Sequence, residues 1–252
     1  MLSKYKISFR RGLQDYVLNE LKEKYPLIDV VKIAKEYIEF RNDGICIEDF
    51  RNIYSATLIT DGRRTLNLSR REWRKKFVPA GLDPSIAYIM CKVANIDENC
   101  IVYDPFCGAS VLPISAILYF NAKRVICSDI SGKAIEMSKQ NFKTANIDMS
   151  RYLLFQSDVC DVKLNKQNVD VIISNLPFGI RVGSHIGNVC SYGCLESIAK
   201  RILKKKGRLL LLTQEKKLLR DVFKKEDWNV KSVLQVDSGG LLPEVFLLTR
   251  RN

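Results

Sequence analysis

Residues 101–129 read IVYDPFCGASVLPISAILYFNAKRVICSD, and this stretch decides the fold. Apolar runs predict strands over residues 101–103 and 124–127, and the segment 111–120 between them predicts a helix. A short turn that contains Gly108 follows the first strand, and glycine permits a tight turn and close approach of backbone to a ligand. The stretch therefore predicts a β-α-β unit with a binding turn.

The same alternation continues to the C-terminus. Continuously apolar strands that alternate with helices indicate a parallel sheet covered on both faces, so we expect a Rossmann-like α/β domain. A closing antiparallel hairpin is expected across Gly239 and Gly240. The further elements predicted are strands 152–155, 169–173, 208–212, 230–236 and 245–248, and helices 133–144, 195–203 and 216–223.

The N-terminal part predicts a small α+β segment. Strands are expected over residues 5–9, 30–33 and 37–40, with helices over 13–24 and 48–58. We expect an N-terminal domain over residues 1–62, a basic linker over 63–82 and the α/β domain over 83–252. Asp83 is expected to cap a helix whose first residue is Pro84.

Composition indicates a globular chain with a polyanionic partner. Of 252 residues, 46% are hydrophobic, and the net charge is +13. No apolar run approaches membrane-spanning length, so a cytoplasmic protein is expected. One basic run can neutralise phosphates, and its tryptophan can stack on a base, although a solvated helix face or linker is the alternative. The expected RNA-binding residues are Arg63, Arg64, Arg70, Arg71, Trp73, Arg74, Lys75 and Lys76.

The eight cysteines are expected to be reduced and buried. Cys190 and Cys194 lie four residues apart with His185 nearby. A zinc site commonly needs four ligands in two close pairs, and a second pair is absent from the sequence, so no metal site is expected.

Three carboxylates follow three successive predicted strands: Asp104, Asp129 and Asp158. Ligands of parallel sheets bind at the carboxyl ends of the strands, and Asp129 comes about 25 residues after Asp104, near the spacing of a ribose-binding acid. Asp158 could accept a hydrogen bond from an adenine amino group. The set predicts a nucleoside-binding rim, and the alternative is that these acids cap helices. A dinucleotide is disfavoured because G-x-G-x-x-G is absent from the sequence.

The fourth strand of the α/β domain leads into Asn175-Leu176-Pro177-Phe178-Gly179. The side-chain oxygen of Asn175 and the backbone carbonyl of Leu176 can accept both hydrogens of a base amine and so aim its lone pair. Pro177 stiffens the turn, and Phe178 can stack on an extruded base. An ordinary turn is the alternative, but the position favours an amine-methylating segment. Arg181 follows as a candidate phosphate contact.

These segments together resemble the THUMP-associated RNA guanine-N2 methyltransferases, with tRNA enzymes the nearest match. The resemblance includes Asp104 to Gly108, residues 175–184, residues 68–74, Pro79 to Leu82 and residues 239–241. It covers the chain from about Thr65 onward, and a fainter match around Arg11-Gly12-Leu13 implies a ferredoxin-like N-terminal domain.

The resemblance implies a class I methyltransferase sheet that binds S-adenosylmethionine and methylates the exocyclic amine of a base in RNA, with guanine N2 in tRNA as the first expectation. It also implies that Asn175, Leu176, Pro177 and Phe178 form the catalytic segment. The implied cofactor-binding residues are Pro79, Ala80, Leu82, Asp104, Phe106, Cys107, Gly108, Asp129, Ile130, Asp158, Val159 and Asn175.

The chain departs from the family pattern at Ser110, Val111 and Ser115, where a second glycine, a threonine and an acid are usual. It also lacks a THUMP domain between the N-terminal segment and the α/β domain, so a protein partner could supply RNA binding. Three alternatives remain open: N6-adenine methylation of DNA, guanine-N2 methylation of ribosomal or small nuclear RNA, and a non-catalytic RNA-binding subunit that retains the fold.

Overall fold

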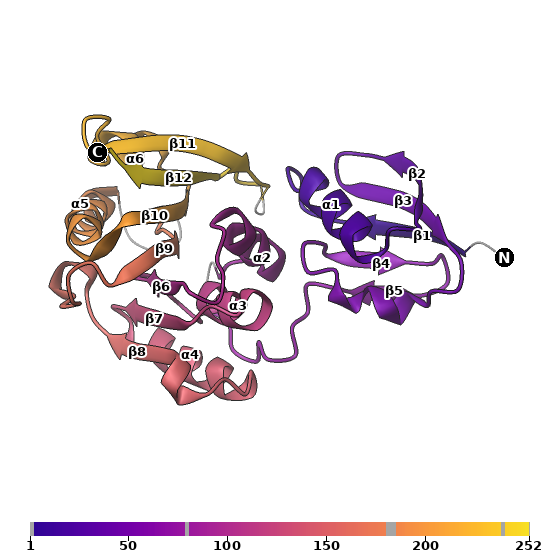
Figure 1. Ribbon diagram of the computed structural model, residues 1–252, viewed down its shortest axis with the longest axis horizontal. Coiled ribbons are helices and arrows are strands. Elements are labelled where there is room, and N and C mark those ends of the chain that lie inside the picture. The colour runs from indigo at the N-terminus through magenta and orange to yellow at the C-terminus, as the bar shows by residue number, and fades with distance from the viewer. Residues whose placement is uncertain (1–2, 79–80, 180–184, 238–239, 252) are drawn as a thin grey trace.

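The computed structural model describes residues 3–78, 81–179, 185–237 and 240–251, which form two sheets (Figure 1). The larger sheet has seven strands in the order β11-β12-β10-β9-β6-β7-β8. The five strands from β10 to β8 are parallel, while β12 is antiparallel to both of its neighbours. This confirms the mostly parallel sheet with a C-terminal hairpin. Its strands are β6 (Ile101–Asp104), β7 (Arg124–Asp129), β8 (Tyr152–Gln156), β9 (Val169–Asn175), β10 (Leu203–Thr213), β11 (Trp228–Gln235) and β12 (Glu244–Arg250).

Helices cover both faces of this sheet. In β10, Leu210 and Leu212 pack in a core with α2, α3 and α4, whereas Leu209 and Leu211 pack in a second core with α5 and α6. Because successive strand side chains point to opposite faces, a strand covered on both sides must be apolar throughout. The helical elements are α2 (Pro84–Val93), α3 (Val111–Phe120), α4 (Gly132–Thr144), α5 (His185–Ile202), α6 (Lys216–Val222), η2 (Met149–Arg151) and η3 (Val159–Asp161).

The smaller sheet is antiparallel, in the order β2-β3-β1-β4-β5. Helix α1 (Gln14–Lys24) packs on it, and the order of its first four strands is that of a ferredoxin-like domain. Its remaining elements are β1 (Ser3–Ser8), β2 (Asp29–Ile33), β3 (Tyr37–Asn42), η1 (Ile47–Asn52), β4 (Leu58–Thr60) and β5 (Thr65–Asn67).

The helix predicted over residues 48–58 is wrong. The chain instead makes the 3-10 helix η1, in which Cys46 N donates to Asp49 Oδ2 at 2.9 Å, and then the strand β4. Ile59 of β4 is buried and pairs with Ile7, so pairing with β1 overrides the local helical pattern. The sheet also continues through β5 into the segment that was expected to be a linker.

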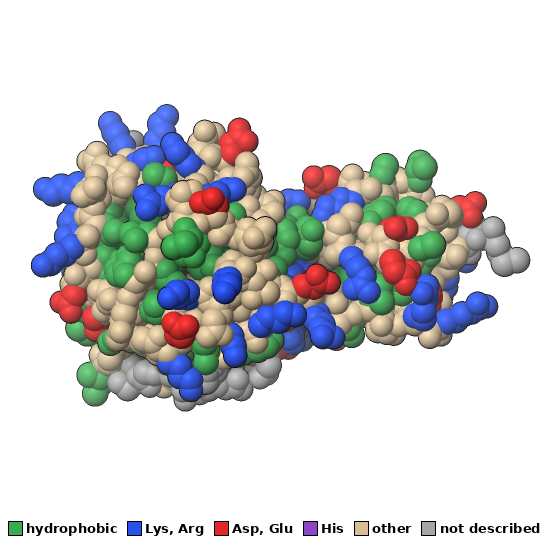
Figure 2. Space-filling view, turned by 90° about the horizontal axis from the view of Figure 1, so that it is seen from below, with side chains coloured by type: hydrophobic (Ala, Val, Ile, Leu, Met, Phe, Trp, Pro, Cys, Tyr) green, Lys and Arg blue, Asp and Glu red, His purple; other side chains and the backbone are tan. Residues whose placement is uncertain are grey.

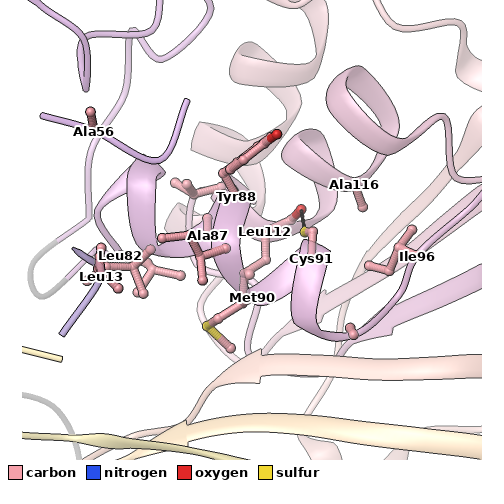
Figure 3. Packing of buried hydrophobic residues seen from close by; sticks show 14 of the residues in the cluster. Leu13, Ala56, Leu82, Ala87, Tyr88, Met90, Cys91, Ile96, Leu112 and Ala116 are labelled. Atoms are coloured by element: carbon pink, nitrogen blue, oxygen red, sulfur yellow. Dashed lines mark hydrogen bonds between the residues drawn. The ribbon is translucent and has the colours of Figure 1, made fainter. Parts of the chain in front are cut away.

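The two domains share a continuous apolar core, part of which is drawn in Figure 3. There Ala87, Met90 and Cys91 of α2 lie beside Leu112 of α3, and Leu13 comes from the N-terminal domain. Asp83 caps α2 as expected, accepting from Ser85 N at 2.9 Å, and it also binds Arg10 across the domain boundary at 3.1 Å.

The backbone at Gly12, just before α1, requires a glycine. Its φ is +96°, and a Cβ there would lie 2.0 Å from the carbonyl oxygen of Gln235, at the end of β11. A larger residue would therefore force the N-terminal domain away from the C-terminal hairpin. Within the described residues, no helix is long and apolar enough to cross a membrane.

Candidate functional site

The turn after β6 is built around the buried carboxylate of Asp104. Its Oδ1 accepts hydrogen bonds from Ser174 Oγ at 2.6 Å and from the backbone N of Phe106 at 3.1 Å. Ser174 lies in the neighbouring strand β9, so the bond ties the end of β9 to the turn. Burial raises the pKa of Asp104 to about 7.

Asp129, at the end of β7, closes the same turn from the other side. Its Oδ2 accepts from Gly108 N and its Oδ1 from Ser131 N, both at 2.9 Å. Gly108 has φ +53°, which glycine adopts without strain. Burial also raises the pKa of Asp129. The adjacent Ile130 is 65% exposed, which leaves an apolar side chain at the rim.

Asp158 joins the rim from the end of β8. Ser157 N donates to the Asp129 carbonyl at 3.0 Å, which brings this loop against the end of β7. Asp158 also caps η3, since its Oδ1 accepts from Cys160 N at 2.8 Å, and Val159 behind it is buried. The three acids thus lie at or just after the ends of three neighbouring strands, β6, β7 and β8. Asp158 also caps a helix, which was the alternative role expected for these acids.

Asn175 ends β9, next to β6. The side-chain oxygen Oδ1 of Asn175 is buried and finds no hydrogen-bond partner within the described residues; we call it the open acceptor. A buried polar atom without a partner is costly, which makes the open acceptor a candidate contact for a ligand group. The sheet register sets Asn175 beside Leu212 of β10, and Leu176 N donates to the Leu212 carbonyl at 3.0 Å.

The segment after Asn175 is held by residues that sequence reasoning missed. The Pro177 carbonyl accepts from Asn188 Nδ2 and from Tyr192 OH, both at 3.0 Å. Tyr192 is fully buried and also bonds Thr213 Oγ1 at 2.7 Å. Phe178 is half-buried and packs against the first core. The α5 residues therefore fix the turn that presents Asn175 and Leu176.

A further missed residue, Asn141 of α4, anchors the chain beside the turn after β6. Its Oδ1 accepts from Lys75 N at 3.1 Å and Lys76 N at 3.0 Å, and its Nδ2 donates to the carbonyls of Lys76 and Ala109 at 3.1 Å each. A Cβ on Gly108 would lie 3.2 Å from Val78. The segment before α2 thus lies against the turn, with Leu82 buried; Pro79 and Ala80 lie outside the described residues.

Ser110 occupies the place of the second family glycine and adopts φ +59°, a left-handed conformation. Its hydroxyl contacts Ser138 Oγ at 2.8 Å, and Ser138 donates to the Gly108 carbonyl at 2.6 Å. The turn therefore keeps the conformation that favours glycine, with side-chain hydrogen bonds in support. Val111 and Ser115 are buried in α3, and Cys107 is buried too, with a pKa raised by its burial. Phe106 is half-buried beside the turn.

Two residues of the predicted RNA-binding run are buried, which corrects that prediction. Arg71 donates to the carbonyls of Leu68 and Tyr54, with its guanidinium 5.1 Å from the centre of the Tyr54 ring. Trp73 donates to Tyr119 OH at 3.3 Å. Their polar atoms serve the junction between the domains, because aromatic residues of both domains surround them.

The other members of the run differ in exposure. Arg64 is exposed but pairs with Glu48 at 2.7 Å, and Arg74 is partly buried over Phe77. On the face seen in Figure 2, basic side chains are spread over both domains and do not gather into one patch. Arg181 lies outside the described residues. The exposed members without a side-chain role named above are Arg63, Arg70, Lys75 and Lys76.

The cysteines differ from expectation as well. Cys160 and Cys194 form a disulfide, while Cys91, Cys100, Cys107 and Cys127 are free and buried as expected. His185 does not join Cys190 and Cys194, because its Nδ1 lies 3.1 Å from Glu215 Oε1.

Sequence comparison places these residues among methyltransferases. Residues 71–244 match a family described as RMKL-like, methyltransferase domain. The tRNA (guanine(6)-N(2))-methyltransferase THUMP3 of Mus musculus is 26% identical over 231 residues, covering 86% of this chain and 46% of its own length. The tRNA (guanine(6)-N2)-methyltransferase of Methanocaldococcus jannaschii is 27% identical over 220 residues, which cover 72% of this chain and 57% of that protein. The chain thus spans about half the length of these relatives.

Structural comparison supports the same fold. The crystal structure of TrmN from Thermus thermophilus aligns over 98% of this chain and 99% of its own, with TM-score 0.84 and 17% identity. SMU.472 complexed with SAH aligns over 100% and 99%, with TM-score 0.78 and 12% identity. Both alignments span the N-terminal and the α/β domain together.

Proposed function

The chain belongs to the RMKL-like methyltransferase domain family, and from this premise we propose that it methylates the N2 amine of guanine in tRNA with S-adenosylmethionine. The single observation that carries the proposal is the open acceptor of Asn175 at the end of β9, beside the acidic rim. The guanine-N2 and tRNA parts rest on the named relatives and on the net charge of +13.

The rim fits this cofactor. S-adenosylmethionine, when bound, supplies a methyl group on a positively charged sulfur. The carboxylate of Asp129 retains acceptor capacity for a ribose after its two backbone bonds, because an ionised carboxylate has about four lone-pair sites. Ile130 offers an exposed apolar side chain to a flat base. Asp158 would accept a hydrogen bond from the adenine amino group.

The segment Asn175 to Phe178 orients the substrate amine. The open acceptor of Asn175 and the carbonyl of Leu176 can each accept one hydrogen of the guanine amine, which directs the nitrogen lone pair away from both. Pro177, tied to Asn188 and Tyr192, keeps this pair of acceptors rigid. Orientation supplies much of the rate when the leaving group is already activated, so a strong general base is not required.

Product analysis tests the proposal. The full chain, incubated with isotope-labelled S-adenosylmethionine and unmodified tRNA, is expected to yield labelled N2-methylguanosine on mass spectrometry of the nucleosides. Asn175→Ala should remove the product. Asn168→Ala is the matched control, because Asn168 is exposed just before the opposite end of β9.

Other outcomes would replace the proposal. Labelled N6-methyladenine from DNA would show that the chain is an adenine methyltransferase of DNA. Product formed only with ribosomal or small nuclear RNA would replace tRNA as the proposed substrate. Absence of S-adenosylmethionine binding at millimolar cofactor in calorimetry would favour a non-catalytic RNA-binding subunit. Product formed only after a cell extract is added would indicate a protein partner.

A further inference from the structure

Three cysteine sulfurs from two separate elements meet between η3 and α5. Cys190 and Cys194 lie one helical turn apart on α5 and face the same side, and Cys160 comes from η3. The three sulfurs all lie within 4.8 Å of one another, with Cys160 Sγ 4.0 Å from Cys190 Sγ. Cys160 and Cys194 are joined as a disulfide with their Cα atoms 5.0 Å apart.

A single disulfide accounts for Cys160 and Cys194 but does not account for the position of Cys190 beside them. Three converging thiols match the donor set of a soft divalent cation, since zinc is bound by thiolates in tetrahedral sites. With zinc–sulfur bonds of about 2.3 Å, neighbouring sulfurs of such a site lie roughly 3.8 Å apart. The 4.0 Å between Cys160 and Cys190 is close to that spacing before any adjustment.

The surroundings suit a charged site of this kind. The cysteines line a cavity of about 1100 Å³. Asp161, exposed and next to Cys160, lines the same cavity and offers a carboxylate oxygen, and solvent can enter there too. Lys163 and Arg201 also line it. Three thiolates around a divalent cation leave one negative charge, which these two cations can offset.

We propose that Cys160, Cys190 and Cys194 bind one divalent cation of the zinc type in the reduced chain, with the fourth coordination position facing the cavity. The disulfide and the metal use the same sulfurs and exclude each other. Loading therefore begins when a thiol reductant gives two electrons to the Cys160–Cys194 bond and leaves as its own disulfide. The three thiols then release their protons as the metal binds.

Such a site would tie together two parts of the rim. Asp158 caps η3 through Cys160 N, and α5 holds the Pro177 carbonyl through Asn188 and Tyr192. A metal between Cys160 and α5 therefore links the loop after β8 to the segment after β9. Its role is structural support, and it does not depend on which nucleotide the chain methylates.

Cobalt substitution of the full chain tests this proposal. After reduction with a phosphine and removal of metals, Co²⁺ is expected to bind at one ion per chain and to give the near-ultraviolet sulfur-to-cobalt charge-transfer absorption. Zn²⁺ should abolish that band by displacement and raise the melting temperature. Each of Cys160→Ser, Cys190→Ser and Cys194→Ser should weaken or remove the band, whereas Cys46→Ser, at an exposed free cysteine outside the cluster, should keep it.

Two results would overturn the proposal. One is a fully reduced chain, verified by thiol titration, that shows no charge-transfer band with Co²⁺. The other is a band that survives unchanged in Cys190→Ser, which would leave Cys160 and Cys194 as an ordinary disulfide pair. Because every variant is scored by metal binding, neither result bears on methylation.

Discussion

Two asparagines, one at each side of the turn after β6, differ in how completely their carboxamides are hydrogen-bonded within the fold. Asn141 of α4 is fully buried, and its oxygen and nitrogen make four hydrogen bonds to the backbone. Asn175 at the end of β9 keeps the open acceptor. A buried polar side chain with all its bonds made holds the fold together, whereas the unpartnered oxygen of Asn175 is the atom that we propose for the substrate amine.

The largest effect should come from Asn175→Ala. We expect kcat/KM for tRNA methylation to fall roughly 1,000-fold, because the substrate amine loses a positioned acceptor. The melting temperature should change little, since the open acceptor supports nothing in the fold. Steady-state kinetics and thermal melting measure the two quantities. A large loss of stability would mean that Asn175 is structural like Asn141.

Asn141→Ala should lower the melting temperature strongly, in contrast to Asn175→Ala. Losing the carboxamide leaves the buried carbonyl of Ala109 and partly buried backbone groups of Lys75 and Lys76 without these partners, which costs about 4 kcal/mol of unfolding free energy in total. For a chain of this size the melting temperature should fall by roughly 8–16 °C. Gln140→Ala, which removes a neighbouring amide with a 3.4 Å contact to Glu136, is the control and should melt near wild type.

Asp104 is an intermediate case, because its bonds are made but its charge is buried. Its pKa of about 7 lies above the unfolded value of about 4, so the folded chain holds a proton that the unfolded chain releases. The contribution of this carboxyl to stability is therefore present at low pH and lost as pH rises toward 7. Asp104→Asn can accept the same two hydrogen bonds without a charge.

We accordingly expect Asp104→Asn to melt above wild type at pH 8 and to lose this advantage toward pH 4. Thermal melts across that pH range, without added cofactor, measure the difference. Asp129 is present in both proteins, and its neighbouring charge adds to the raised pKa of Asp104. Parallel melting profiles for the two proteins would show that the charge of Asp104 is not buried in solution.

The smallest effect extends the comparison to the basic run. Arg70 and Lys76 are exposed, so the double variant Arg70→Ala/Lys76→Ala should weaken RNA binding about tenfold at low salt and reduce the slope of log K against log salt by about 2. Arg71→Met should leave that slope unchanged and lower the melting temperature instead. Fluorescence anisotropy at several salt concentrations decides the first point. A reduced slope of log K against log salt in Arg71→Met would indicate that Arg71 contacts RNA after all.

Much of the α/β domain could be predicted because its signals are local. The helix Val111–Phe120 was predicted with its observed bounds, and the cap at Asp83 and the strands of the sheet were predicted nearly as well. The helix expected over residues 48–58 failed, because β4 is decided by its pairing with β1. Helix α5 begins ten residues earlier than its predicted start at 195, at His185, in a stretch whose sequence carries a weak apolar pattern.

The sequence by itself determined the order of strands and helices in the α/β domain and the placement of Asp104, Asp129, Asp158 and Asn175 at or just after strand ends. Those features depend on short-range periodicity and on residues close in the chain. The tertiary structure alone decided which polar side chains are hydrogen-bonded within the fold: the carboxamide of Asn141 makes four bonds, while Oδ1 of Asn175 makes none to the described residues. It also brought Cys160 to Cys190 and Cys194. Burial and hydrogen bonding between segments distant in the chain depend on how the elements pack, and local patterns do not encode that packing.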